Sequence, residues 1–537
     1  MNNTKKIVSV LVCVFMVLGI IGMGMFVKPE EKETSEDYSD SLVIWYVDEE
    51  MSDYLNRMAF DYREHNGIRV IPKLMNGDEY IESIYEASVK DENPPDLYIL
   101  SNDTLEKAYL SGCAVPIDDM GVTTDKNFSK VALHAVTYDN DIIAYPYYFE
   151  TSVLLYNKTY LHDMAENIVI AENESEETEE DNSGKNASSG ADKSAEATGD
   201  SNGSTGGSSG SSSESSGTTG ASSGANGTAN GASGTNGTVT DPTGAGTSAG
   251  GELDNSDGLD ATDTEDDEMI MDEEDVEREK VIAQMMSDSI PSTFDEIMSF
   301  ADNYDAPMQV ESVFKWDVRD IFFNYFFIGN YMDIGGIHGD DPSKIDIYNE
   351  NTVKAMQMYQ DMNQFFSFES EDVTYDQVVN EFISGKLVFA TATSDIVAKL
   401  KEAADNGDFE YEYGIAPIPN LNEELVSKGM SVTNCIVING YSDKQEEANN
   451  FARYLAIDKA RMLYEEASKM PAATSMKNID ETLEVFAREY EKSVPMPKLM
   501  ATADYWLMLE STFADIWSGK DVSKCLEELE EKIKPAE

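Results

Sequence analysis

Hydrophobic and polar positions along the chain follow two periods in turn, which predicts alternating strands and helices. Residues 42–47 form a β-rich apolar run that ends at the acids Asp48, Glu49 and Glu50. From residue 51 to 67 the apolar positions have helical spacing, and a His-Asn-Gly sequence ends the helix before the next strand-like run. This alternation predicts an α/β fold built on open parallel sheets.

Some acids stand directly after predicted strands, where an open α/β sheet binds its ligands. Asp48 follows the first strand, and Asp103 opens a helix after the strand at residues 96–100. Both also suit a structural role, because Asp caps helices and acids in a first turn, Glu49 included, complement the helix dipole. The binding role and the structural role are both open for these residues.

Glu150 is the strongest single candidate for a binding residue. It lies between the strand-like runs 142–146 and 153–156, in a stretch that is otherwise aromatic and apolar. A carboxylate buried in such surroundings needs a hydrogen-bonding or charged partner, and a ligand can supply one.

A long central segment interrupts the pattern. No Phe, Tyr or Trp occurs between Tyr160 and Phe294, and residues 166–279 hold 28 acids and 3 bases. Such a segment buries too little apolar area to offset its ordering entropy, so residues 166–285 are predicted to be a disordered, acidic, Gly/Ser-rich insertion. The fold resumes at a helix capped by Ser292 or Thr293.

The N-terminus predicts export. Lys5 and Lys6 precede about 20 uncharged, mostly apolar residues, from Ile7 to Val27. This stretch is long enough to span a bilayer as one helix, with its positive end in the cytoplasm. Residues 1–35 are therefore predicted to be a signal anchor that holds the bulk of the chain outside the cell membrane. Cleavage as a signal peptide is the alternative.

Charge and motif content exclude several functions. The 537 residues include 103 acids against 38 Lys plus Arg, a formal charge of -65, which argues against nucleic acid and anionic membrane surfaces as partners. Cys113, Cys435 and Cys525 are widely spaced and favour buried thiols over a disulfide framework or a zinc site. The chain has 4 His and none of the common catalytic motifs. We therefore predict that it is not an enzyme and that it binds no metal or cofactor.

A series of short motifs runs from about residue 42 to 533. The motifs are Leu42-Val43-Ile44-Trp45, Pro95-Asp96-Leu97, Ser111-Gly112 before Val115-Pro116-Ile117, Ile143-Ala144-Tyr145-Pro146 with Glu150, Leu155-Tyr156-Asn157-Lys158, Pro291-Ser292-Thr293-Phe294-Asp295-Glu296, Phe382-Ile383-Ser384-Gly385-Lys386 and Gly414-Ile415-Ala416-Pro417. Each motif is weak by itself. In this order, they resemble the extracellular solute-binding proteins of the maltose-binding type.

The resemblance implies a two-lobed, periplasmic-binding-protein-like fold with a hinge. Its lobes close around a ligand that an ABC importer then receives. Each lobe is implied to form from separate stretches of the chain: residues 42–148 and 437–475 for lobe 1, and residues 152–165, 290–428 and 480–537 for lobe 2. The insertion then belongs to lobe 2.

The resemblance also implies which residues meet the ligand. In the family, carboxylates bind sugar hydroxyls and aromatic rings cover sugar C–H faces. Four residues match the ligand contacts of the family by type: Asp48, Asp103, Glu150 and Trp506. Asp317 falls where the family has another cleft acid. Leu100, Thr104, Arg319 and the region near Asp395 depart from the maltose-binding members, which argues against maltose. Arg319 can instead pair with an acidic ligand group.

The sequence therefore predicts an exported, membrane-tethered protein that captures a carbohydrate-like solute between two lobes for an ABC importer. The predicted ligand-binding residues are Asp48, Glu49, Asp103, Glu150, Asp317, Arg319 and Trp506. The predicted partners are a small solute such as a sugar, the permease of an ABC transporter and the membrane through the N-terminal helix. A cationic solute such as a polyamine, and a membrane-anchored sensor or scaffold without a transport role, are the alternatives.

Overall fold

The computed structural model describes residues 40–91, 93–117, 121–185, 273–366, 373–476, 480–499 and 505–534. The predicted anchor, residues 1–35, and the middle of the predicted insertion lie outside these ranges. Within the described residues, no helix is long and apolar enough to cross a membrane. The chain divides into two units, residues 1–173 with 274–537 and residues 174–273, and the fold described here is that of the first.

The first sheet contains seven strands in the order β14-β6-β13-β3-β1-β2, with β15 also paired to β13. β1 is parallel to β2 and β3, whereas β13 is antiparallel to β3 and β6. Every residue of β1 is buried, as expected for a strand with helices on both faces. The strands are β1 (Ser41–Tyr46), β2 (Arg69–Leu74), β3 (Leu97–Ser101), β6 (Tyr145–Thr151), β13 (Met430–Ile438), β14 (Met470–Pro471) and β15 (Val494–Pro495).

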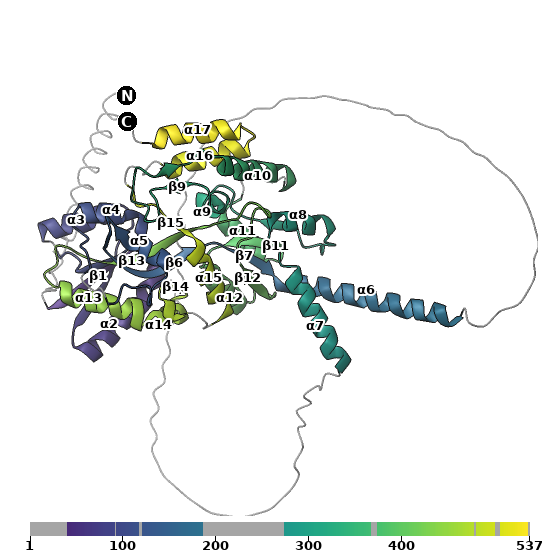
Figure 1. The fold of residues 1–537 in the computed structure, drawn as a ribbon. Helices are drawn as coiled ribbons and strands as arrows, with labels where there is room; N and C mark the ends of the chain where they lie inside the picture. Colours follow the sequence, from purple (N-terminus) through teal and green to yellow (C-terminus); the bar gives the residue numbers. More distant parts are fainter. Residues whose placement is uncertain are drawn as a thin grey trace, which may run out of the picture. The chain divides into compact units, whose positions relative to one another are not determined.

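Helices cover both faces of this sheet (Figure 1). Leu42 and Ile44 face α2, α13 and α14, whereas Val43 and Trp45 face α3 and α4, because neighbouring side chains on a strand point to opposite faces. α2 ends at Gly67, whose left-handed backbone confirms the predicted helix end. The elements are α2 (Ser52–Asn66), α3 (Tyr80–Lys90), α4 (Leu105–Leu110), α5 (Lys130–Val136), β4 (Thr137–Tyr138), β5 (Asp141–Ile142), α13 (Gln445–Arg453) and α14 (Ala460–Ala467).

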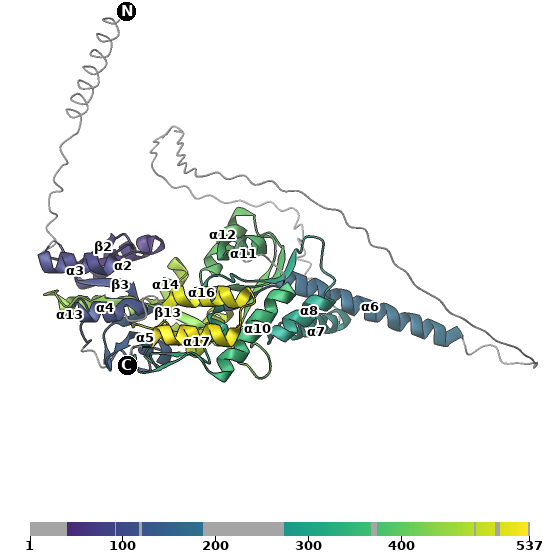
Figure 2. The same ribbon diagram turned by 90° about the horizontal axis from the view of Figure 1, so that it is seen from above.

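The second sheet contains four strands in the order β12-β7-β11-β8. Thr293 caps α8 in a capping box with Glu296, which confirms the helix start predicted at this point. α10, α16 and α17 lie side by side (Figure 2). The elements are β7 (Val153–Asn157), α8 (Phe294–Asn303), β8 (Ser312–Lys315), α9 (Ile321–Asn324), β9 (Asp333–Ile334), β10 (Ile345–Asp346), α10 (Glu350–Phe366), α11 (Tyr375–Ile383), β11 (Leu387–Ala392), α12 (Ile396–Asn406), β12 (Tyr413–Ala416), α16 (Tyr505–Trp517) and α17 (Val522–Ile533).

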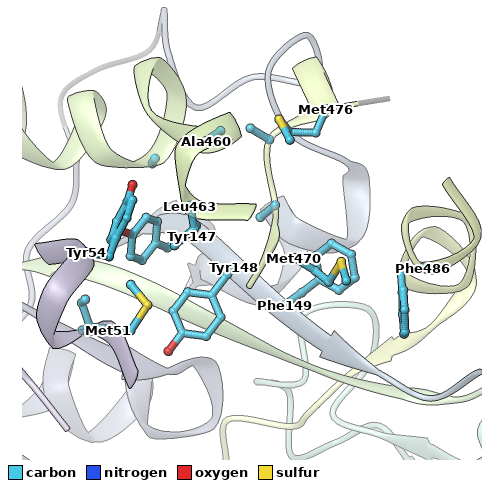
Figure 3. Close-up of a cluster of buried hydrophobic side chains, with 14 of the residues drawn as sticks. Met51, Tyr54, Tyr147, Tyr148, Phe149, Ala460, Leu463, Met470, Met476 and Phe486 are labelled. Atoms are coloured by element: carbon cyan, nitrogen blue, oxygen red, sulfur yellow. The ribbon is translucent and has the colours of Figure 1, made fainter. Parts of the chain in front are cut away.

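We call the first sheet with its helices lobe 1 and the second sheet with its helices lobe 2. The chain passes between them at Ser152, between β12 and β13, and after β15. α15 (Glu481–Lys492), which the sequence assigned to lobe 2 alone, contacts β6 of lobe 1 as well as β7 and β12. The ring of Phe149 on β6 stacks on Tyr490 of α15 with centroids 3.9 Å apart. Phe149 and Phe486 belong to one buried cluster at this junction (Figure 3).

The structure differs from the predicted insertion at both of its ends. α6 (Lys158–Lys185) continues past residue 166, and α7 (Glu273–Asp288) begins before residue 285. Ala165 and Val169, one turn apart on α6, form a buried cluster with Ile282 of α7. A prediction from average composition misses these few apolar positions because acids dominate the segment. Their helical spacing is nevertheless enough to bury them against each other.

Candidate functional site

A cavity of about 300 Å³ lies between the two lobes. Lobe 1 contributes residues of β6 and of the turns after β1 and α14, and lobe 2 contributes residues around α9, α11 and the start of α12. We call it the front cavity. Residues of both lobes line it, so movement of one lobe against the other changes its size.

Lys469 is the centre of the lobe 1 wall. Its Nζ lies 2.9 Å from a carboxylate oxygen of Asp48 and 2.7 Å from one of Glu50. Burial acts to lower the pKa of Lys469, but its hydrogen bonds to Glu50 and Asp48 outweigh burial and raise it. The Tyr148 hydroxyl donates to Asp48 at 3.3 Å. Figure 3 shows this hydroxyl directed away from the other tyrosines of the cluster.

Asp48 has the structural role that its sequence position allows and also contacts residues that line the cavity, although it is not part of the lining itself. Its Oδ1 accepts from the backbone N–H of Glu50 at 3.1 Å and so caps the 3-10 turn Glu49–Met51. Its other oxygen binds Lys469 and Tyr148. Glu49 is exposed and stands outside the lining of the front cavity.

Glu150 lines the front cavity from β6. Among the described residues its carboxylate has one hydrogen-bond partner, the side-chain amide of Asn434 at 3.4 Å. Burial raises the pKa of Glu150, the positive charge of Lys469 opposes that rise, and the negative charges of Asp395 and Asp48 add to it. A half-buried carboxylate with so few donors gains most from a ligand that donates hydrogen bonds or carries positive charge.

Asp395, just before α12, is the centre of the lobe 2 wall. It accepts from the Tyr375 hydroxyl at 2.7 Å and from the Thr393 hydroxyl, and Lys399 Nζ lies 2.9 Å away. Burial acts to raise the pKa of Asp395, but these three donors outweigh it and lower the pKa. The ring of Phe323 stacks on Tyr375 with centroids 4.6 Å apart.

The two walls together offer hydrogen-bond acceptors and aromatic surface. Ionised carboxylates accept paired hydrogen bonds from adjacent hydroxyls, and rings cover apolar C–H faces, so these are the two features that a sugar site needs. The charged residues of the lining are four acids and one base: Glu50, Glu150, Asp320, Asp395 and Lys469. This set suits a hydroxyl-rich or cationic ligand that is held without covalent chemistry.

Asp103 lies at the carboxyl end of β3 but outside the front cavity. Its carboxylate accepts from the Ser101 hydroxyl, and burial raises its pKa. The expected helix cap is absent, because neither the 3-10 turn at residues 102–104 nor α4 has a side-chain cap. The neighbouring Asn102 instead joins strands, since it accepts from Thr433 N at 2.8 Å.

Asp317 and Arg319 line a second cavity, of about 550 Å³, within lobe 2. The buried Asp317 carboxylate accepts from the backbone N–H groups of Arg319, Asp320 and Tyr375 at 2.9, 3.1 and 2.9 Å. These bonds fix the loop after β8 against α11 and so help to position Tyr375 for the front cavity. Although this cavity is the larger one, lobe 2 alone builds it, so closure of the lobes cannot enclose a ligand there.

Trp506 lies apart from the other predicted residues. It is half-buried on α16, with its ring centroid 6.2 Å from that of Tyr325 and 4.9 Å from that of Tyr505, and it lines neither cavity. Of the predicted residues, Glu150 lines the front cavity, and Asp48 lies outside the lining but contacts its residues Lys469 and Tyr148. Trp506 lies elsewhere on lobe 2.

Several residues of the front cavity were missed from the sequence. Asp395 follows β11 as Asp48 follows β1, so the rule that acids after strands face the ligand would have found it. Phe322 is half-buried and lines the cavity. Lys469 has no local signal, because it reaches the site through the packing of α14 on lobe 1.

One group of possible metal ligands occurs among the described residues, on α6. His162, Asp163 and Glu166 place one ligand atom each within 4.8 Å of one another. None of the three residues lines the front cavity, and partly exposed groups of this kind are common without an ion. It gives no reason to revise the prediction that the chain has no resident metal.

Comparison with known proteins identifies relatives of this fold. No family model matches the sequence. The chain is 25% identical to the maltodextrin-binding protein MdxE of Bacillus subtilis (strain 168), over 38% of this chain and 50% of that protein. The match thus spans half the length of that relative.

Solved structures match over nearly the whole chain. The extracellular solute-binding protein from Staphylococcus aureus in complex with maltose has a TM-score of 0.60 and 17% identity, covering 92% of this chain and 96% of that chain. The maltose-binding periplasmic protein MalE from Listeria monocytogenes in complex with maltose has a TM-score of 0.59 and 16% identity, covering 92% and 97%. These matches confirm the predicted α/β fold and the resemblance drawn from the motifs. The matched proteins are named as binding proteins, in line with the prediction that the chain is not an enzyme.

Proposed function

We propose, from its resemblance in sequence and fold to the extracellular solute-binding proteins of the maltose/maltodextrin type, that this chain captures a carbohydrate-like solute in the front cavity. The observation that carries the proposal is the lining of that cavity, where carboxylates and aromatic rings from both lobes face the same space. A solute that contacts both walls stabilises the closed arrangement by the free energy of those contacts. No chemical step is needed.

The size and polarity of the cavity favour a small solute. A volume of about 300 Å³ stands at the lower end of the range for ligand pockets. In each wall one charged lining residue is paired with a partner outside the lining, Lys469 with Asp48 and Asp395 with Lys399. This leaves polar groups at positions where a long oligosaccharide needs aromatic surface. We therefore expect a sugar that is small or carries polar substituents.

We further propose that residues 1–35 hold the protein at the cell membrane and that its partner is the permease of an ABC transporter. The apolar run Ile7–Val27 after two lysines supports export. A membrane-anchored sensor or scaffold with the same fold is the alternative. A permease gene beside this one would favour import, and a histidine kinase gene would favour sensing.

A thermal-shift screen of the protein against mono- and disaccharides tests the solute-binding proposal. A solute that binds only the folded state raises the unfolding midpoint by mass action. We expect Glu150→Gln to abolish the shift, because it removes the least satisfied carboxylate of the cavity, and Glu49→Gln to leave it unchanged. A shift that survives Glu150→Gln would place the site elsewhere, and no shift from a cooperatively melting protein would favour the sensor or scaffold role.

A cationic solute is the second candidate, and Glu150 favours it specifically. Four acids and one lysine line the cavity, and that lysine is already bound by Asp48 and Glu50. Screening amino sugars and polyamines beside neutral sugars separates the candidates. A cationic solute should bind more weakly as salt rises, whereas a neutral sugar should not respond.

A further inference from the structure

A buried lysine lies at a second junction between the lobes. Lys498, in the segment after β15, is 1% exposed. Its Nζ donates to the backbone carbonyl oxygen of His134 at 3.1 Å and to that of His338. Burial lowers the pKa of Lys498 to about 8. One carbonyl comes from α5 of lobe 1 and the other from the turn between β9 and β10 of lobe 2, so the lysine ties the two lobes together.

Two further hydrogen bonds join the same segments. Lys498 N donates to the carbonyl oxygen of Gly339 at 2.8 Å. Asp139 N, between β4 and β5 of lobe 1, donates to the Asp340 carboxylate of lobe 2 at 3.0 Å. We call these two bonds and the carbonyl bonds of Lys498 the back contact.

The close approach of the segments depends on a glycine. A Cβ atom at Gly339 would lie 2.9 Å from the Cα atom of Pro497, and the residue has a φ of +65°. Only glycine fits both the space and the backbone conformation without strain. The back contact is therefore a tightly packed feature of the fold.

The back contact lies on the opposite side of β13 from the front cavity. The amide of Asn434 donates to Glu150 in the front cavity. The next residue, Cys435, belongs to a buried cluster with Val136 of α5, and the positive charge of Lys498 partly offsets the rise in the Cys435 pKa that burial causes. Neighbouring side chains on a strand point to opposite faces, so Lys498 and Glu150 stand on opposite sides of the strand that joins the lobes.

We propose that the back contact opposes closure of the front cavity, which makes Lys498 a positioning residue that sets ligand affinity. Lobes that turn about the strands between them to narrow the front must widen the back. Closure then loses the carbonyl bonds of Lys498, and apparent affinity falls in proportion to the fraction of molecules that can close. The inference rests on the hinge closure of the proposed function and is independent of which solute binds.

Acidification should weaken the back contact. The rings of His134 and His338 lie 5.2 Å apart by centroid, and burial lowers the pKa of both. The charged groups that face the two histidines are Lys130, Lys344, Lys498 and Asp340. The positive charges of the lysines lower the histidine pKa values further, whereas the negative charge of Asp340 acts to raise the pKa of His338. A histidine with a lowered pKa stabilises the contact above its ordinary pKa, near 6.5, and that stabilisation is lost as pH falls below it.

The test measures the distance between the lobes in the full-length protein without ligand. Spin labels at Asp53→Cys in α2 and Lys401→Cys in α12 occupy exposed positions near the two walls of the front cavity. Cys13→Ser and Cys525→Ser leave only the two buried native thiols. Pulsed electron paramagnetic resonance then gives the populations of longer and shorter distances.

Lys498→Met removes the donors of the back contact and keeps the apolar side chain. We expect the shorter-distance population to rise about fivefold, the factor that the loss of one net hydrogen bond produces. Asp340→Ala should shift the populations in the same direction by less. Lys354→Met is the matched control, because it removes an exposed lysine of lobe 2 outside the back contact, and it should change little.

The pH response separates the histidines from the front carboxylates. Lowering the pH from 7.5 to 5.5 should raise the shorter-distance population of the wild type. Protonation of Glu150 acts in the same direction, because it removes repulsion from Asp395 across the cavity. His134→Gln with His338→Gln should therefore reduce the response without abolishing it.

The inference is overturned if Lys498→Met folds and its distances match those of the control or lengthen. If Lys498→Met does not fold, Asp340→Ala decides, and unchanged distances in that variant overturn the inference equally. A shift in the distances with no solute found in the thermal screen would leave the inference standing and remove the proposed solute role. If a solute binds and its binding requires Glu150, but the inter-lobe distances are unchanged in both Lys498→Met and Asp340→Ala, the proposed solute role stands and the inference is overturned.

Discussion

The front cavity and the back contact join the same two lobes with opposite polar chemistry. At the front, Glu150 is half-buried with one amide donor at 3.4 Å, and the carboxylates of the two walls repel one another. At the back, Lys498 is sealed from solvent and bound by a carbonyl oxygen from each lobe. The back contact is complete by itself, whereas the front cavity still lacks donors. A ligand supplies what the front lacks, so the two junctions act on the hinge in opposite directions.

The largest effect is expected where the front cavity meets the lobe junction. Phe149 lines the cavity, is 2% exposed and stacks on Tyr490 of α15. Phe149→Ala should lower the free energy of unfolding by about 3–5 kcal/mol, because it leaves a void in a closely packed cluster. Urea denaturation measures the loss. Phe60→Ala, at a position that is 65% exposed, is the control and should stay within about 0.5 kcal/mol of the wild type.

The next effect tests the tightness of the back contact. Gly339→Ala should cost about 2–4 kcal/mol of unfolding free energy, since it combines an unfavourable φ with a clash against the backbone of Pro497. Gly67→Ala has a similar φ of +74° and nothing within 4 Å of the added Cβ, so it should cost about 1 kcal/mol. Equal losses of unfolding free energy in the two variants would mean that Gly339 and Pro497 are less closely packed than the structure shows.

A smaller effect is expected on the lobe 2 wall. Tyr375→Phe removes the donor that binds Asp395 at 2.7 Å and should lower the unfolding free energy at pH 7 by about 1 kcal/mol. A lowered carboxyl pKa stabilises the fold above its unfolded value, so the difference should shrink as pH falls through the folded pKa of Asp395. Carbon-13 NMR should show that pKa rising in the variant. Tyr348→Phe, at an exposed position, is the control.

The smallest effect has the opposite sign. Because the folded pKa of Glu150 is raised, its stabilising contribution is present below the unfolded pKa and lost as pH rises through the folded value. Glu150→Gln should therefore raise the melting temperature at pH 7.5 by about 1–2 °C, because the unfolding entropy of so long a unit is large and ~1 kcal/mol then shifts the midpoint only a little. The gain should vanish near pH 4. Glu49→Gln should show no such gain. A fall in melting temperature would mean that Glu150 is already satisfied without a ligand.

Much of the fold was predictable because local pattern and local structure agree. The strand that ends at Asp48, the helix that ends at Gly67 and the helix that begins after Thr293 each have signals within a few residues. The order of the motifs predicted the two-lobed fold that the solved structures match. The ends of the acidic segment were predicted less well, because the apolar positions of α6 and α7 are too few to change its composition.

The sequence by itself determined the class of fold and the strong negative charge, and it singled out Glu150 as an acid in an aromatic strand. Only the tertiary structure decided which other groups meet it. Lys469 reaches the cavity because α14 packs against β14 and α2, and Asp395 reaches it from the other lobe, more than 200 residues along the chain. Lys498 becomes a tie between lobes for the same reason. Convergence of this kind follows from how sheets and crossing strands pack, and no local pattern records it.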